Sequence, residues 1–116
     1  MTANKYEALS HTTHSEADGG LSSGDADLVA RTLIAISLND EDWRWVQQHA
    51  LQFLTHESDL VVSAAILSLG HTAGRNRSID KHVVIPALQH VATHSRYAGK
   101  VQDAIDDIEM YVISAS

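Results

Sequence analysis

Apolar residues recur along this chain with the spacing of helices rather than of strands. The longest apolar run is LVVSAAILSLG, at 60–70, near the middle of the 116 residues. Its apolar side chains fall on more than one side of a helix, which is typical of a helix that is surrounded by others. We therefore predict a central helix over 59–74 in which neighbours cover Leu60, Ala64 and Leu67.

Further helices are predicted on both sides of this run. Apolar stripes at helical spacing cover 25–38, 42–55, 80–94 and 98–112. A weaker pattern predicts a short helix within 3–16, and the glycines and serines of 18–24 predict a loop. A helical wheel places Trp43 on the apolar stripe of its helix, so we expect it in the core. The pattern predicts an all-α fold of six helices.

The predicted helices repeat. The segment LVARTLIAIS at 28–37 aligns with VVSAAILSLG at 61–70 at a shift of 33 residues, and a weaker match follows at a shift of 39. HALQFL at 49–54 likewise aligns with PALQHV at 86–91. Repeats of this length are typical of stacked helix pairs. We expect about three pairs in an α-solenoid, with 1–24 as part of the first repeat and 25–116 as the repeat domain of a single-domain protein.

The repeated segments resemble those of HEAT-like repeat proteins. In that family a Pro followed by Leu marks the first helix, and Val, Ala and Leu at fixed spacing mark the second. The matching residues here are Pro86, Leu88, Val101, Ala104 and Ile108, and then Val62, Ala65 and Leu69. The resemblance covers about 25–112 and implies a HEAT-like α-solenoid, of a kind that in small bacterial proteins is often a binding module.

Composition and charge narrow the classes of function. The net charge is −7 with His neutral, which disfavours nucleic-acid and anionic-membrane partners. The charge is compatible with a basic protein partner, and solubility alone would also explain it. The chain has no cysteine, which excludes disulfides and thiolate metal sites. No run is long enough for a membrane span, and the N-terminus shows no apolar signal region, so a cytoplasmic location is expected.

Three sets of residues are candidates for partner binding. Trp45 falls away from the apolar stripe of its helix beside His49, so it is either an exposed anchor or packed on a neighbouring segment. The last helix carries carboxylates around a methionine on its polar face, and an acidic turn lies between two earlier helices. These acidic candidates are Asp103, Asp106, Asp107, Glu109 and Met110, together with Asp40 and Glu41. A terminal cap of the array, or acids at a helix start, would explain both acidic groups without a partner.

The eight histidines raise the question of a metal site. His90 and His94 have the spacing that places two rings on one helix face, and His11 and His14 are three residues apart. Two ligands do not complete a site, and His56–Glu57 is a single pair where some HEAT-like iron enzymes have several. We assign no catalytic residue, metal or cofactor.

These observations favour a non-catalytic protein-binding module. Its most concrete form is an immunity protein or antitoxin that covers a basic bacterial toxin domain. The alternative is a HEAT-like metal-dependent or bilin-lyase-type enzyme or subunit. A DNA-binding HEAT-like protein ranks last, because few Lys and Arg residues are available to line a groove.

Overall fold

The computed structural model describes residues 13–112, and every regular element within that range is an α-helix. The helices are α2 (His14–Leu21), α3 (Ala26–Asn39), α4 (Trp43–Phe53), α5 (Asp59–Asn76), α6 (Lys81–Val91) and α7 (Ser95–Tyr111). The predicted all-α class and its six helices are therefore confirmed for this part of the chain. No described helix is both long and apolar enough to cross a bilayer.

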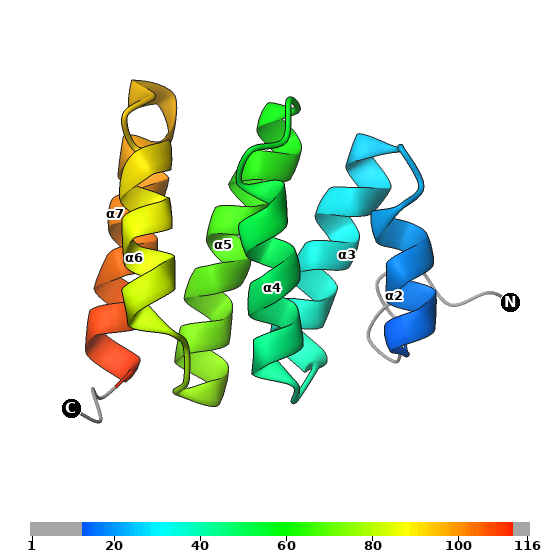
Figure 1. Ribbon diagram of the computed structural model, residues 1–116, viewed down its shortest axis with the longest axis horizontal. Helices are drawn as coiled ribbons and strands as arrows, with labels where there is room; N and C mark the ends of the chain where they lie inside the picture. The colour runs from blue at the N-terminus through cyan, green and yellow to red at the C-terminus, as the bar shows by residue number, and fades with distance from the viewer. Residues whose placement is uncertain (1–12, 113–116) are drawn as a thin grey trace, which may run out of the picture.

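The helices form two rows. In one row α5 lies between α3 and α7 and packs on both of them. The other row, nearer the viewer in Figure 1, contains α2, α4 and α6, each beside the row of α3, α5 and α7. The turns α2–α3, α4–α5 and α6–α7 all lie along the same edge of the molecule (Figure 1). The overall dimensions are 46 × 30 × 20 Å.

Side chains just before the first turn stabilise the start of most of these helices. Before the first turn of four helices, a side-chain oxygen accepts a backbone N–H that has no partner within the helix. These capping residues are Thr13, Asp25, Asp42 and Ser58. At Thr13 the Glu16 side chain reciprocates the bond, completing a capping box.

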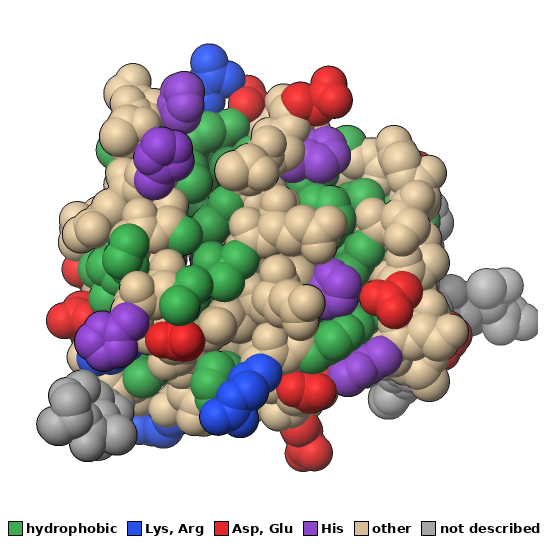
Figure 2. All heavy atoms as spheres, viewed as in Figure 1, with side chains coloured by type: hydrophobic (Ala, Val, Ile, Leu, Met, Phe, Trp, Pro, Cys, Tyr) green, Lys and Arg blue, Asp and Glu red, His purple; other side chains and the backbone are tan. Residues whose placement is uncertain are grey.

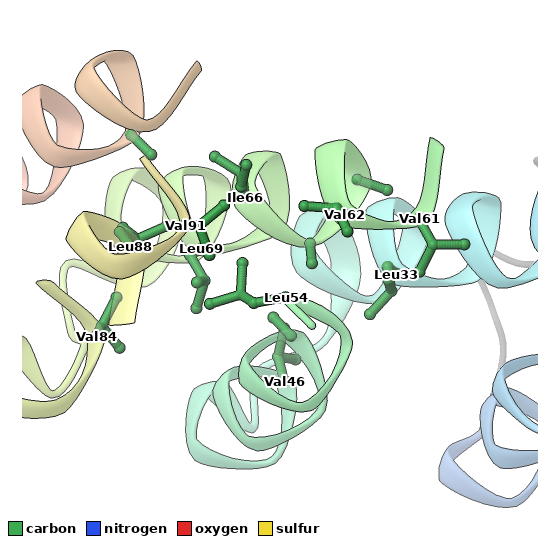
Figure 3. Packing of buried hydrophobic residues seen from close by; sticks show 14 of the residues in the cluster. Leu33, Val46, Leu54, Val61, Val62, Ile66, Leu69, Val84, Leu88 and Val91 are labelled. Atoms are coloured by element: carbon green, nitrogen blue, oxygen red, sulfur yellow. The ribbon is translucent and has the colours of Figure 1, made fainter. Parts of the chain in front are cut away.

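The core follows the predicted apolar stripes. Figure 3 shows side chains from α4, α5 and α6 meeting in one cluster. Among its fully buried members are Leu33, Val46, Ile66, Leu69, Leu88 and Ile108. Because α5 contributes residues to this cluster from several of its sides, its placement as the central helix was predicted correctly.

The predicted loop at 18–24 is wrong in its first half, because α2 continues to Leu21. Gly20 lies within this helix, where a Cβ would come 2.5 Å from the Oγ1 of buried Thr32. The glycine therefore permits close packing of α2 on α3 rather than a turn. Of the helix expected within 3–16, residues 1–12 lie outside the described range.

Two later boundaries also differ from the prediction. Helix α5 runs two residues past Gly74 and ends where Arg77 adopts a left-handed conformation, φ 54°. Helix α6 ends at Val91, and α7 already begins at Ser95. His90 and His94 therefore do not share a helix face, since His94 is the residue before α7.

Two expectations about burial were also wrong. Leu60 and Leu67 are exposed by 51% and 44%, because α3 and α7 cover the flanks of α5 but not the strip between them. Trp43 is partly exposed and lies outside the core cluster, at the first residue of α4. Its ring lies under the Arg44 guanidinium, 4.4 Å from the ring centroid.

Candidate partner-binding surface

The polar face of α7 is exposed as predicted. Asp103, Asp106 and Glu109 lie in solvent, and Met110 is 69% exposed among them. Two of the carboxylates have protein partners: Asp106 accepts a hydrogen bond from Gln102 at 2.9 Å, and Glu109 lies 3.7 Å from Lys81. The face thus combines negative charge with an apolar side chain that is available for contact.

Asp103 and Asp107 line a shallow groove between α5 and α7, with a volume of about 100 Å³. Gly70 forms part of its wall, and a Cβ there would come 3.3 Å from an Asp107 carboxylate oxygen. Exposed Leu67 lies at the same groove. Within residues 13–112, neither Asp103 nor Asp107 forms an ion pair, although Lys100 lines the same groove.

His71 also lines this groove, and its surroundings favour its neutral form. Burial lowers its pKa below the usual 6.5, and the nearby Asp107 carboxylate opposes part of that shift. Its Nδ1 lies 3.3 Å from Ser37 Oγ on α3. The groove therefore presents two carboxylates and one lysine beside a histidine whose neutral form is favoured.

Trp45 and His49 lie at the other end of the molecule. The ring of Trp45 stacks on His14 of α2 with centroids 3.7 Å apart, and His49 meets it edge-on at 4.8 Å. His14 is also 2.9 Å from Asp40, and His49 is 3.5 Å from Asp18. Of the two interpretations of Trp45, the structure therefore favours packing on a neighbouring segment, because the residue is partly buried against the core.

The acidic turn before α4 is also engaged within the chain. Asp40 accepts the Asp42 amide at 2.8 Å, and its backbone oxygen accepts Arg75 Nη1 at 2.9 Å. Its side chain is only 15% exposed. Glu41 remains in solvent. Of the predicted acidic sites, the face of α7 is thus far more accessible than the turn around Asp40.

Sequence reasoning missed a pocket at the edge that carries the turns. It lies between the α4–α5 and α6–α7 turns and has a volume of about 410 Å³; we call it the turn pocket. Its polar lining is Thr55, His56, Asp59, His90, His94, Arg96 and Tyr97. Asp59 and Tyr97 are 38 residues apart, and the predicted last helix began only after Tyr97, so no local pattern predicts their contact. Within the described residues, no group of three or more His, Cys, Asp or Glu side chains has the geometry to hold a metal ion.

No known family model and no curated protein sequence matches this chain. Its structure is similar to a chain in the crystal structure of a CDI complex from Cupriavidus taiwanensis LMG 19424, with a TM-score of 0.81. The two sequences are 22% identical, and the match covers 97% of this chain and 99% of the other. At that identity, the likeness shows that the two chains share a fold over almost their whole lengths.

Proposed function

We propose that this chain is a non-catalytic protein-binding module of the immunity or antitoxin type, which neutralises a basic bacterial toxin domain by binding it. The observation that carries the proposal is the end-to-end match to a chain of a CDI complex, which we interpret as a toxin–immunity assembly. The match spans both chains almost completely, so it does not arise from one helix pair alone.

The charge distribution supports a basic partner. The chain carries a net charge of −7, and α7 presents Asp103, Asp106 and Glu109 around exposed Met110. Opposite potentials raise the rate of encounter between two proteins, and a desolvated apolar side chain adds affinity at the centre of the contact. We propose the face of α7, together with the adjoining α5–α7 groove, as the contact surface.

The finer parts of this proposal follow from the same features. We propose that the three helix pairs, α2–α3, α4–α5 and α6–α7, are HEAT-like repeats of an α-solenoid, which supplies a rigid scaffold for a flat acidic surface. We also propose that the protein acts in the bacterial cytoplasm, where it would protect the cell from an incoming or self-made toxin.

The proposal can be tested by titration calorimetry. The partner is the C-terminal domain of a secreted protein encoded beside this chain, expressed in an inactive form. The wild-type chain should bind it with one-to-one stoichiometry, and affinity should fall as salt rises, because exposed charges are screened. Replacing Asp103, Asp106 and Glu109 by Lys should weaken binding by about a hundred-fold or more, since like charges then face each other.

A matched control distinguishes the effect of the charges on α7 from the effect of the net charge of the whole chain. Replacing Asp18, Asp27 and Glu57 by Lys changes the net charge equally, but all three residues are exposed and lie outside α7. This control should bind within a few-fold of the wild type at physiological salt. Equal weakening by both triple variants would remove α7 from the proposal, and no complex with the wild type would contradict the proposal as a whole.

A further inference from the structure

The turn pocket has an apolar floor and a polar rim. Leu54, Val62 and Val91 form the floor, and each of them is largely buried. The pocket lies where the ends of α4 and α6 leave α5 and α7 uncovered between them. Figure 2 shows histidine side chains and a basic side chain gathered along this edge, over the α6–α7 turn. A volume of about 410 Å³ is in the range of small-ligand sites.

The carboxylate oxygens of Asp59 in the rim already accept hydrogen bonds from neighbouring side chains. Tyr97 donates its hydroxyl hydrogen to Asp59 Oδ1 at 2.5 Å, and Arg96 Nη1 donates to Asp59 Oδ2 at 2.7 Å. Chiefly because of the Tyr97 hydrogen bond, and also because of the Arg96 charge, the pKa of Asp59 lies below its usual 3.8. The Asp59 charge is therefore matched by a cation and a hydroxyl, and it offers little attraction to a cationic ligand.

Donor groups in the rim remain available. Within residues 13–112 the structure gives the other N–H groups of the Arg96 guanidinium no protein acceptor. His56 Nδ1 accepts the Ser58 amide at 2.9 Å, so the neutral ring carries its hydrogen on Nε2, as a donor. His90 and His94 add two exposed rings to the same rim. The pocket is thus richer in available donors than in available acceptors.

The backbone around the pocket also favours an anion. Helix α7 begins here at Ser95, the side chain of the preceding His94 does not cap it, and its first turn holds no acidic residue. The partial positive charge of a helix start attracts anions. Helix α6 ends at the same edge, but the turn satisfies two of its last carbonyls: His94 N donates to Val91 O at 3.1 Å, and Thr93 Oγ1 donates to His90 O at 2.7 Å.

We infer that the turn pocket binds a carboxylate carried on an apolar body, with Arg96 and the histidines around the carboxylate and the leucine–valine floor against the body. The inference does not depend on the immunity role, because it concerns the isolated chain. A free aromatic acid and the C-terminal residue of a peptide both have this chemistry.

The test is an NMR titration of the full chain with para-toluate, its neutral isostere para-toluamide, and the peptide Gly-Gly-Phe with a free or an amidated C-terminus. We expect the ring Cε1–H signals of His56, His90 and His94 to move with para-toluate or the free peptide. The uncharged partner of each pair should bind roughly ten-fold more weakly, the loss expected for about 1.4 kcal/mol of charge-assisted hydrogen bonding. The tighter of the two acids identifies the source.

Variants localise the effect. Arg96→Gln should weaken acid binding about ten-fold, and His90→Gln, which removes one of the rings that line the rim, should weaken it by a few-fold. His82→Gln on the same helix as His90, and Arg31→Gln on α3, serve as matched controls and should bind as the wild type. If Arg96→Gln fails to fold, judged by helical circular dichroism, exposed His90 carries the test alone. Equal affinity for acid and amide, or binding unaltered by Arg96→Gln and His90→Gln, would overturn the inference.

Discussion

At the scale of the residue, two adjacent glycines in α2 have opposite surroundings. A Cβ at Gly20 would come 2.5 Å from Thr32 Oγ1, whereas a Cβ at Gly19 meets nothing within 4 Å. Thr32 cannot easily yield, because it is fully buried, is branched at Cβ and donates to Leu28 O at 2.7 Å.

The two glycines should therefore respond oppositely to alanine. Gly20→Ala should lower the free energy of unfolding by about 1–3 kcal/mol, because it overpacks the contact of α2 with α3. Gly19→Ala should raise it by about 0.5 kcal/mol, because alanine favours the helix. Urea denaturation of both variants measures the two values, and a stable Gly20→Ala would contradict the close packing at Thr32.

The Asp59–Tyr97 hydrogen bond predicts a pH-dependent effect on stability. The folded-state pKa of Asp59 is below 3.8, so its stabilisation is present above pH 3.8 and is lost as the pH falls through the folded value. The folded-state pKa of Tyr97 is above 10, so its share is present below pH 10 and is lost as the pH rises through the folded value.

Tyr97→Phe should thus lower the midpoint of thermal unfolding at pH 7, and the difference from the wild type should shrink below pH 3.8. Tyr111→Phe is the matched control, since the Tyr111 ring contacts Arg77 and its hydroxyl has no hydrogen bond within the described residues. Thermal scans at several pH values measure the effect. A difference that persists unchanged in acid would show that the Tyr97 hydroxyl stabilises through another contact.

At the scale of the element, α5 shows which features of the fold can be predicted from the sequence and which cannot. Its place at the centre followed from the apolar run at 60–70, because a helix with several apolar sides must meet several neighbours. The exposure of Leu60 and Leu67 did not follow, since periodicity alone does not reveal how far apart α3 and α7 lie. Helix starts with a capping side chain, such as Ser58, were predicted well, whereas α7 starts without one and was placed too late.

The candidate site was likewise predictable only in part. The acidic face of α7 is local to one helix, so its exposure could be predicted from the spacing of Asp103, Asp106 and Glu109. The surroundings of Trp45 and the existence of the turn pocket depend on contacts between elements. Those contacts have no signature in a single segment of sequence.

The two sides of α5 should differ in their response to truncation. Leu69→Ala removes a fully buried side chain and should cost about 2–5 kcal/mol of unfolding free energy. Leu67→Ala removes one that is 44% exposed and should cost about 1 kcal/mol or less. Chemical denaturation compares the two, and equal losses would indicate that a further contact covers Leu67 in solution.

At the scale of the whole molecule, two kinds of surface lie in different places. The end formed by α7 is acidic with exposed Met110, and the edge that carries the turns holds a pocket of hydrogen-bond donors. A scaffold of packed helix pairs keeps both surfaces in fixed positions. A basic toxin domain would meet the first surface by charge complementarity, and the second remains available to a carboxylate.

The central claim, that this chain protects against a toxin by binding it, is tested most directly by rescue of growth. Cells that express the active C-terminal domain encoded beside this chain should stop growing, and co-expression of the chain should restore growth. The variant with Lys at 103, 106 and 109 should fail to restore it, whereas the control with Lys at 18, 27 and 57 should succeed. Continued toxicity in the presence of abundant, folded wild-type chain would contradict the claim.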